Sequence, residues 1–220
     1  MKEMTVARST FTGWFRSDRV IKLAAFILIA VPTVYLVAGW YSDTLDIRFY
    51  TQEWGPLEVS HALLCAVSSW LFYLAWRDGK GPVKVAGGAL SMLAAAAFVR
   101  ELDIKKTAAS LGLDRVHFLA DNGLQEVLLV GMTTPIFVYL FRQREHFWGC
   151  VALGLRWPAW PLFLAGAIIL GTVYLDERVV VNVRMRFWEE LVETFGYLLM
   201  ALAGWRHLQL VGDERWERVA

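Results

Sequence analysis

The sequence predicts an all-α membrane protein built as a bundle of six transmembrane helices. Three observations support this fold class: 57% of the 220 residues are hydrophobic, the apolar runs are about as long as a bilayer is thick, and no pattern of β-barrel strands is present. A hydrocarbon core of ~30 Å needs roughly 20 residues of helix. Only helices and closed barrels satisfy their backbone hydrogen bonds in lipid, so helices are predicted.

Six apolar runs meet this length or nearly meet it, and each is predicted to form one span. In chain order they are Leu23–Trp40, Leu57–Trp76, Val83–Val99, Leu124–Phe141, Trp160–Leu175 and Trp188–Trp205. They leave little sequence for a soluble domain, so we expect a single integral membrane domain over residues 1–220. The first run is longer than the apolar region of a usual signal peptide, and no clear A-x-A site follows it, so we expect it to be retained.

Lysine and arginine are unevenly distributed between the two sides of the predicted bundle. Both terminal tails, the second-to-third connection and the fourth-to-fifth connection together hold 14 of the 22 basic residues. Because basic residues accumulate on the cytoplasmic side, both termini are predicted to be cytoplasmic in a multi-pass inner-membrane protein. The third-to-fourth connection, 104–122, mixes apolar and charged residues, which predicts short helices lying in the outer interface.

Other features of the sequence exclude several classes of function. The net charge of +1 gives no indication of nucleic-acid binding. The two cysteines, Cys65 and Cys150, belong to no CxxC or metal-finger pattern, so neither a disulfide nor thiol redox chemistry is expected. The small residues Gly87, Gly88 and Ser91 predict close packing of the third span against a neighbour.

Ionisable side chains recur at one depth in four of the predicted spans. His61, Glu126 and Glu190 each lie 16 residues before an arginine that marks the cytoplasmic end of the span. At 1.5 Å per residue this places them ~24 Å above the inner boundary. The third span runs the other way and brings Glu101 to nearly the same height. We therefore expect these side chains to line a polar pocket just inside the outer interface.

Further carboxylates lie at helical spacing from this layer. Glu58 is three residues before His61, and Glu193 is three residues after Glu190, so each pair shares a helix face. The Glu-x-x-His spacing is the one by which a helix offers two ligands to a metal in carboxylate-bridged bundles, although those bundles have a second such motif and this chain has none. Carboxylates with one imidazole suit Zn, Fe or Mn as the divalent cofactor. The predicted metal ligands are Glu58, His61, Glu101, Glu190 and Glu193.

The leading functional hypothesis is a pocket that binds a cation and acts on a polar lipid head group or a small substrate at the outer leaflet. The predicted catalytic residues are Glu126 and Glu190, as further ligands or a general base, and Arg100. With Lys105 and Lys106, Arg100 would hold an anionic group. The expected partners are the lipid bilayer and either a lipid head group or another membrane protein; nucleic acid is not expected.

Two alternatives remain open from the sequence, which does not decide whether the protein is an enzyme. The first is a non-enzymatic membrane subunit or assembly factor, in which Arg100, Arg184 or Arg186 neutralises the carboxylates in a structural ion-pair network. The second is an ion-coupled transporter. It is less favoured because polar residues do not continue toward the inner side and no paired broken half-helices are present.

Overall fold

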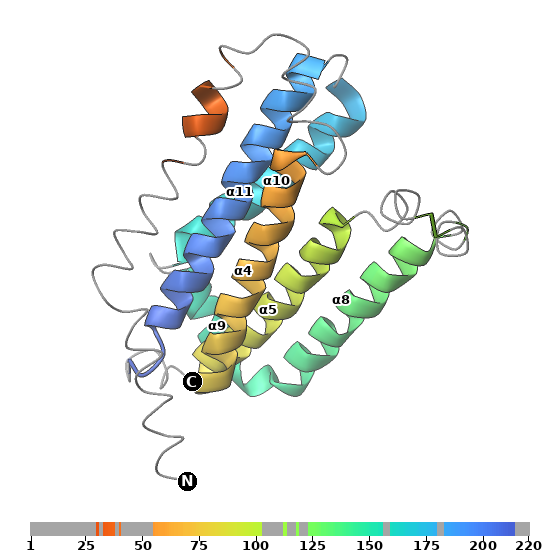
Figure 1. The fold of residues 1–220 in the computed structure, drawn as a ribbon. Coiled ribbons are helices and arrows are strands. Elements are labelled where there is room, and N and C mark those ends of the chain that lie inside the picture. Colours follow the sequence, from red (N-terminus) through yellow and green to blue (C-terminus); the bar gives the residue numbers. More distant parts are fainter. Residues whose placement is uncertain are drawn as a thin grey trace. The chain divides into compact units, whose positions relative to one another are not determined.

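The computed structural model describes residues 30, 33–37, 40, 55–102, 112–113, 118, 123–155, 159–179 and 183–213, without the side chains of 125–126, 173–179 and 183. The chain divides into two compact units, Met1–Ser42 and Asp43–Ala220, which we describe separately. In the first unit, residues 33–37 are helical. In the second, every regular element of the described ranges is a helix (Figure 1). The all-α prediction is therefore confirmed, while a single domain over 1–220 stays a prediction.

Five long helices of the second unit coincide with five of the predicted runs. They are α4 (Pro56–Asp78), α5 (Gly81–Glu101), α8 (Leu124–Arg142), α10 (Trp160–Val179) and α11 (Val183–Gln209). Two of them, α4 and α5, are long and apolar enough to cross a membrane. Most of the remaining run, Leu23–Trp40, lies outside the described residues, so six spans and cytoplasmic termini stay predictions.

The turn between α4 and α5 is built from residues that favour an abrupt change of direction. Helix α4 ends at Asp78, and Gly81 follows with a φ of 49°, a conformation that glycine adopts without steric cost. Pro82 lies in the first turn of α5, where the missing N–H of proline costs no hydrogen bond. Because the connection is this short, α4 and α5 are antiparallel neighbours.

The predicted close packing of the third span is confirmed at the contact between α4 and α5. A Cβ atom added to Gly87 would lie 2.9 Å from the backbone nitrogen of Trp76, closer than side-chain carbons approach a backbone. One turn further, the Ser91 hydroxyl donates a hydrogen bond of 3.0 Å to the backbone oxygen of Ser69. The small residues therefore allow the two helix backbones to approach closely.

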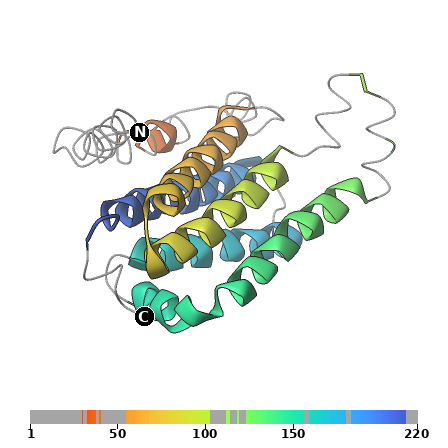
Figure 2. The ribbon, with the colours of Figure 1, turned by 90° about the horizontal axis from the view of Figure 1, so that it is seen from below.

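The long helices pack as a row with one short helix beside it. Within the row α4 and α5 are antiparallel, whereas α4 and α11 are parallel, since His61 lies beside Thr194 and Phe72 beside His207. Helix α4 packs against both α5 and α11, α10 packs on α11, and α8 packs on the other side of α5. Figures 1 and 2 both show α5 between α4 and α8. The buried core of this unit comes mainly from α4 and α11, with one residue each from α5 and α10, and its members are Cys65, Phe72, Ala94, Ala165, Tyr197, Met200 and Ala203. Both cysteines are free, as expected.

Two features of the helices were not predicted from the sequence. The fourth-to-fifth connection contains a 3-10 turn, η1 (Arg144–His146), followed by α9 (Phe147–Gly154), which packs on α5. Helix α11 begins at Val183, five residues before the predicted span, because no helix-breaking residue separates these positions from the apolar run. The predicted interfacial helices over 104–122 fall almost entirely outside the described residues.

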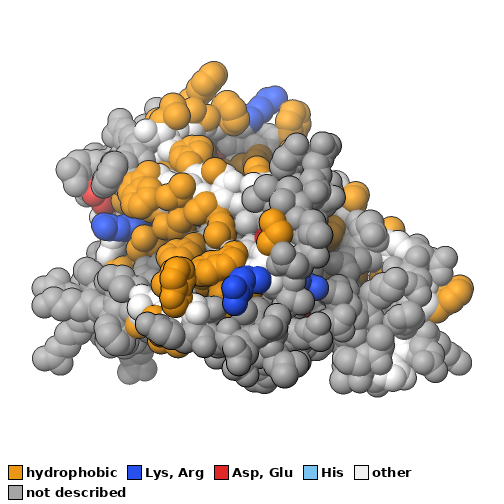
Figure 3. Space-filling model, turned by 90° about the horizontal axis from the view of Figure 1, so that it is seen from above, with side chains coloured by type: hydrophobic (Ala, Val, Ile, Leu, Met, Phe, Trp, Pro, Cys, Tyr) orange, Lys and Arg blue, Asp and Glu red, His pale blue; other side chains and the backbone are white. Residues whose placement is uncertain are grey.

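Large apolar side chains cover much of the described surface. Phe137 and Phe141 on α8 are 74% and 72% exposed, Trp148 on α9 is 76% exposed, and Leu170 on α10 is 72% exposed. In Figure 3 the described side chains are mainly hydrophobic, with lysine and arginine in small groups. Exposed apolar surface of this kind is typical of a protein that contacts a membrane or another protein.

Candidate cation site

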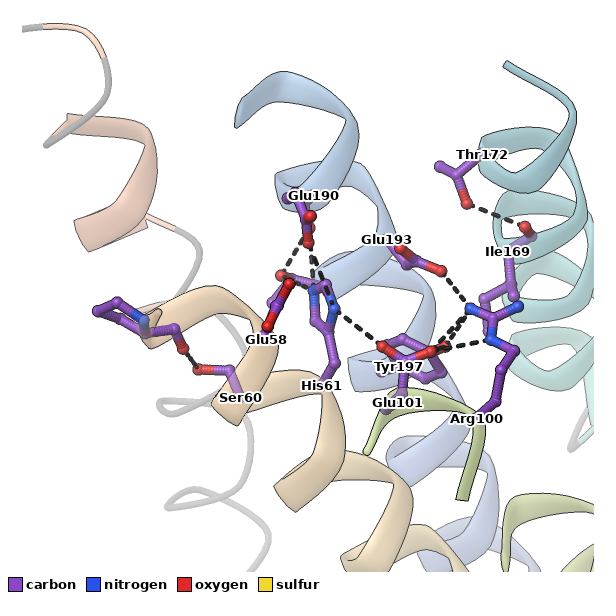
Figure 4. A network of polar contacts seen from close by, with 12 residues as sticks. Glu58, Ser60, His61, Arg100, Glu101, Ile169, Thr172, Glu190, Glu193 and Tyr197 are labelled. Carbon is purple, nitrogen blue, oxygen red and sulfur yellow. Dashed lines mark hydrogen bonds and ion pairs between the residues drawn. The ribbon is translucent and has the colours of Figure 1, made fainter. Parts of the chain in front are cut away.

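Three helices bring the ionisable layer together at one end of their packed contact. His61 lies in the second turn of α4, Arg100 and Glu101 lie at the end of α5, and Glu190 and Glu193 lie in the first half of α11 (Figure 4). Since α5 is antiparallel to α4, its last turn lies beside the first turns of α4. His61, Glu101 and Glu190 therefore lie at one level of the bundle, while their depth in a membrane stays a prediction.

The hydrogen bonds of His61 determine which ring nitrogen carries the hydrogen. Its Nε2 lies 3.1 Å from the backbone oxygen of Glu190 and 2.8 Å from the Oγ1 of Thr194. A carbonyl oxygen only accepts, and the Thr194 hydroxyl already donates its own hydrogen to the same carbonyl at 2.8 Å. Nε2 is therefore the donor to both oxygens.

The second nitrogen of His61 faces carboxylates. Nδ1 is buried without a hydrogen-bond partner among the described residues, and the side chain is 0% exposed. The nearest charged atoms are the Oε2 of Glu101 at 3.4 Å and the Oε2 of Glu190 at 3.6 Å. In the neutral ring, Nδ1 would present a lone pair to two negative groups. A proton or a metal ion at Nδ1 would convert this repulsion into attraction.

Arg100 connects the carboxylates of α5 and α11. Its Nη2 donates to the Oε1 of Glu193 at 2.6 Å, to the Oε1 of Glu101 at 2.8 Å and to the hydroxyl of Tyr197 at 2.8 Å. Tyr197 in turn donates to the Oε1 of Glu101 at 2.7 Å. Both glutamates therefore use Oε1 on this network, and the Oε2 of Glu101 faces His61.

A second arginine lies at the rim of the site. The Nε of Arg186 is 3.6 Å from the Oε1 of Glu190, and its Nη2 is 3.9 Å from the Oε1 of Glu58. Arg186 and Glu58 are 44% and 23% exposed, so water weakens both ion pairs. The structure thus places Glu58 at the rim of the site, joined to Glu190 through Arg186.

Three of the predicted ligands are arranged so that they could hold one metal ion. His61, Glu190 and Glu193 each offer one ligand atom, and these atoms all lie within 4.8 Å of one another. Ligands bound at roughly 2.1 Å in a tetrahedral site are about 3.5 Å apart, so binding would draw them together by about 1 Å. If the imidazole is neutral, Glu101, Glu190 and Glu193 together carry more negative charge than Arg100 can neutralise. The excess equals the charge of one divalent cation.

The structure assembles part of the predicted site and adds two residues to it. It brings His61, Arg100, Glu101, Glu190 and Glu193 together, whereas the side chain of Glu126 and all of Lys105 and Lys106 lie outside the described residues. Thr194 and Tyr197 were not predicted. Both lie four residues after a site glutamate on α11, Glu190 and Glu193 respectively, which is the spacing that places two side chains on one helix face.

The described fold and site define an all-helical protein with two helices able to cross a membrane and a cluster of one buried histidine and two partly buried glutamates. Comparisons of the chain with protein-family models, with curated proteins and with solved structures found no match. The function is therefore argued from the residues of the cluster.

Proposed function

We propose that this chain is a multi-pass membrane protein that binds a divalent cation between α4, α5 and α11. The observation that carries the proposal is the environment of His61: Nε2 is held as a donor by a backbone carbonyl, while the buried Nδ1 faces carboxylates and has no hydrogen bond within the described part of the chain. Metal-ligating histidines typically donate their other ring N–H to a carbonyl in this way. Carboxylates with one imidazole suit Zn, Fe or Mn.

Elemental analysis of the purified protein, followed by titration with Zn²⁺ and Mn²⁺ after chelation, tests cation binding. We expect about one equivalent of bound metal in the native protein and none in the double variant Glu190→Gln/Glu193→Gln, because amides are weak ligands. The matched control is Glu145→Gln, since Glu145 is 76% exposed and far along the chain from the cluster. Equal binding by the double variant would contradict the proposed site.

The membrane part of the proposal is supported by the two long apolar helices and by the exposed apolar side chains of α8, α9 and α10. Two shorter apolar helices, Val127–Arg142 and Trp160–Thr172, extend this pattern. In the proposed topology the protein has six spans in the inner membrane, with both termini in the cytoplasm. Cysteines introduced beside Lys80 and Arg144 should be inaccessible to an impermeant thiol reagent in intact cells; labelling from outside would overturn this topology.

The substrate in this proposal is a polar lipid head group or a small anionic molecule at the outer leaflet. Arg100 is 35% exposed and lies beside the proposed cation position, so the two would present neighbouring positive charges to an anion. Glu190, or Glu126 on α8, would then act as a general base. Binding of a short-chain phosphatidylglycerol that requires the metal would support this step, and equal binding with and without metal would contradict it.

A second candidate function, a structural ion-pair network in a membrane subunit or assembly factor, is favoured by Arg100. One of its nitrogens bridges two carboxylates and a tyrosine from two helices, which can fix helix packing without any catalysis. In that case His61 is protonated at Nδ1 and pairs with Glu101 and Glu190. Native protein that neither contains nor binds metal, yet loses stability in the Glu190→Gln/Glu193→Gln variant, would favour this function.

A further inference from the structure

A second feature of the bundle is an apolar cavity toward the end opposite to the cation site. Its volume is about 230 Å³. Glu190 and His207 are 17 positions apart on α11, so the site and the cavity are separated by ~25 Å along this helix. The cavity is lined by Phe72, Ala86, Ala89, Leu90, Leu140, Cys150, Leu153, Gly154, Ala159, Leu162, Ala203, His207 and Leu210.

The two polar side chains of the lining direct their hydrogen bonds to the backbone of α5. The Cys150 thiol donates to the carbonyl oxygen of Pro82 at 3.6 Å, and the Nε2 of His207 donates to the carbonyl oxygen of Val83 at 2.8 Å. Burial raises the pKa of the Cys150 thiol, so this group stays uncharged. The wall of the cavity is thus almost wholly apolar.

The size and chemistry of the cavity limit what can occupy it. Apolar cavities stay dry, and one of about 150 Å³ in another protein holds a benzene molecule. Sites for drug-sized ligands are larger, roughly 300–1,000 Å³. A cavity of about 230 Å³ therefore fits one slender apolar group, with no charged or strongly polar part inside it.

We propose that this cavity binds a single acyl chain of a membrane lipid. The proposal rests on the membrane location argued above but not on the cation. Its support is the surface that adjoins the lining: Leu140 on α8 and Leu162 on α10 are followed in the chain by Phe141 and Phe163, which are 72% and 59% exposed. In a bilayer, the exposed side chains of Phe141 and Phe163 contact acyl chains. Acyl chains are therefore the most abundant apolar groups beside the cavity.

Photo-crosslinking tests the proposal. The full chain is reconstituted into phosphatidylcholine vesicles that contain a phosphatidylcholine with a diazirine near the end of one acyl chain, and the labelled residues are located by mass spectrometry. We expect labelling of cavity residues such as Leu153 and Leu210 to fall at least fivefold in Ala89→Phe, which fills the cavity. The control Ala167→Phe places the same side chain on the exposed face of α10 and should leave this labelling unchanged.

A second filling variant keeps the test decisive if Ala89→Phe does not fold. Among the residues that the structure describes, a Cβ at Gly154 would meet only the Phe163 ring, at 3.8 Å, so Gly154→Leu adds volume at the lining without a close contact to their backbone. Labelling confined to exposed residues such as Phe137 and Phe141 overturns the proposal and leaves the membrane location intact. Cavity labelling that both filling variants leave unchanged overturns it as well, because another segment would then occupy the space. If the chain fractionates as a soluble protein, the proposed membrane location itself is contradicted.

Discussion

His61 and His207 are the two buried histidines of the described chain, and they occupy opposite ends of the contact between α11 and its neighbours. In each, Nε2 donates to a backbone carbonyl, that of Glu190 for His61 and that of Val83 for His207. Their remaining surroundings differ. His61 faces three glutamates and an arginine network, whereas His207 packs against the Phe72 ring, 5.8 Å between centroids, and lines an apolar cavity.

The comparison shows that burial and a fixed tautomer do not by themselves make a histidine a ligand. Both rings are held by a carbonyl, which is the support expected for a metal-ligating imidazole. Within the described ranges, carboxylates lie near the second nitrogen of His61, and none is found beside that of His207. The predictions below separate the carboxylate-rich end from the apolar end with paired variants.

The largest expected effect is on cation binding when His61 is removed. His61→Ala should weaken binding by more than about 100-fold, because even residues that only orient a ligand contribute roughly 10- to 100-fold. His207→Ala removes an equally supported imidazole at the apolar end and should leave the affinity unchanged. Metal titration of the two purified variants measures the difference. Similar losses in both would show that the carboxylates do not distinguish the two ends.

The next effect concerns stability and compares two arginines of the same bundle. Arg100→Met leaves Glu101 and Glu193, which are 11% and 14% exposed, without their shared partner. Breaking a fully buried pair costs about 3–5 kcal/mol; because Arg100 is partly exposed, we expect about 2 kcal/mol. Arg77→Met breaks a pair with the adjacent Asp78 and should cost less than about 0.5 kcal/mol.

Unfolding of these two variants in mixed micelles, followed by tryptophan fluorescence, gives both values. Equal destabilisation by the two substitutions would mean that water screens the Arg100 network as well as it screens a surface pair. The ion-pair network would then contribute little to holding α5 against α11.

A third prediction concerns the contact between α4 and α5, which positions both the carboxylate-rich end and the apolar end of the bundle. Gly87→Ala places a methyl group 2.9 Å from the backbone nitrogen of Trp76 and 3.1 Å from the backbone oxygen of Phe72. Since backbone atoms cannot move aside as a side chain can, α4 and α5 must separate, at a cost of about 1–3 kcal/mol. Gly171→Ala on α10 meets no atom of the described residues within 4 Å and should stabilise its helix by roughly 0.5–1 kcal/mol.

In the same unfolding assay, Gly87→Ala should lower the free energy of unfolding, whereas Gly171→Ala should raise it. If Gly87→Ala were also stabilising, the close approach of α4 and α5 would not constrain the bundle. The position of Glu101 beside His61 would then need another explanation.

Much of the helical fold could be predicted from the sequence because long apolar runs end at glycine, proline or charge. Helix α4, for example, begins at Pro56 and ends before Gly79, within two residues of the predicted run. Helix α9 was missed because its eight residues are too few to span a bilayer and follow a charged stretch. Spans were predicted from the length of apolar runs, so an apolar helix shorter than a span was not recognised by this criterion.

The sequence predicted the level along the helices at which the site residues lie, but not which side chains contact one another. Counting residues along each helix placed His61, Glu101 and Glu190 at one level, because the rise per residue is fixed. The choice of partners depends on how the helices are rotated toward one another, which no single helix determines. For that reason Thr194 and Tyr197, which the network uses, were not predicted.

The smallest expected effect on cation binding comes from Thr194, which supports the His61 ring and is not a ligand itself. Thr194→Val removes the Oγ1 that accepts from Nε2 at 2.8 Å, while the carbonyl of Glu190 still accepts at 3.1 Å. The ring should therefore keep its tautomer but hold its orientation less firmly, and cation affinity should fall about tenfold, or about 1.4 kcal/mol. Thr172→Val is the matched control, because Thr172 is equally buried and its hydroxyl donates to the carbonyl oxygen of Ile169 within its own helix. If the His61 cluster is instead an ion-pair network, Thr194→Val lowers the free energy of unfolding and leaves metal titration flat in both variants.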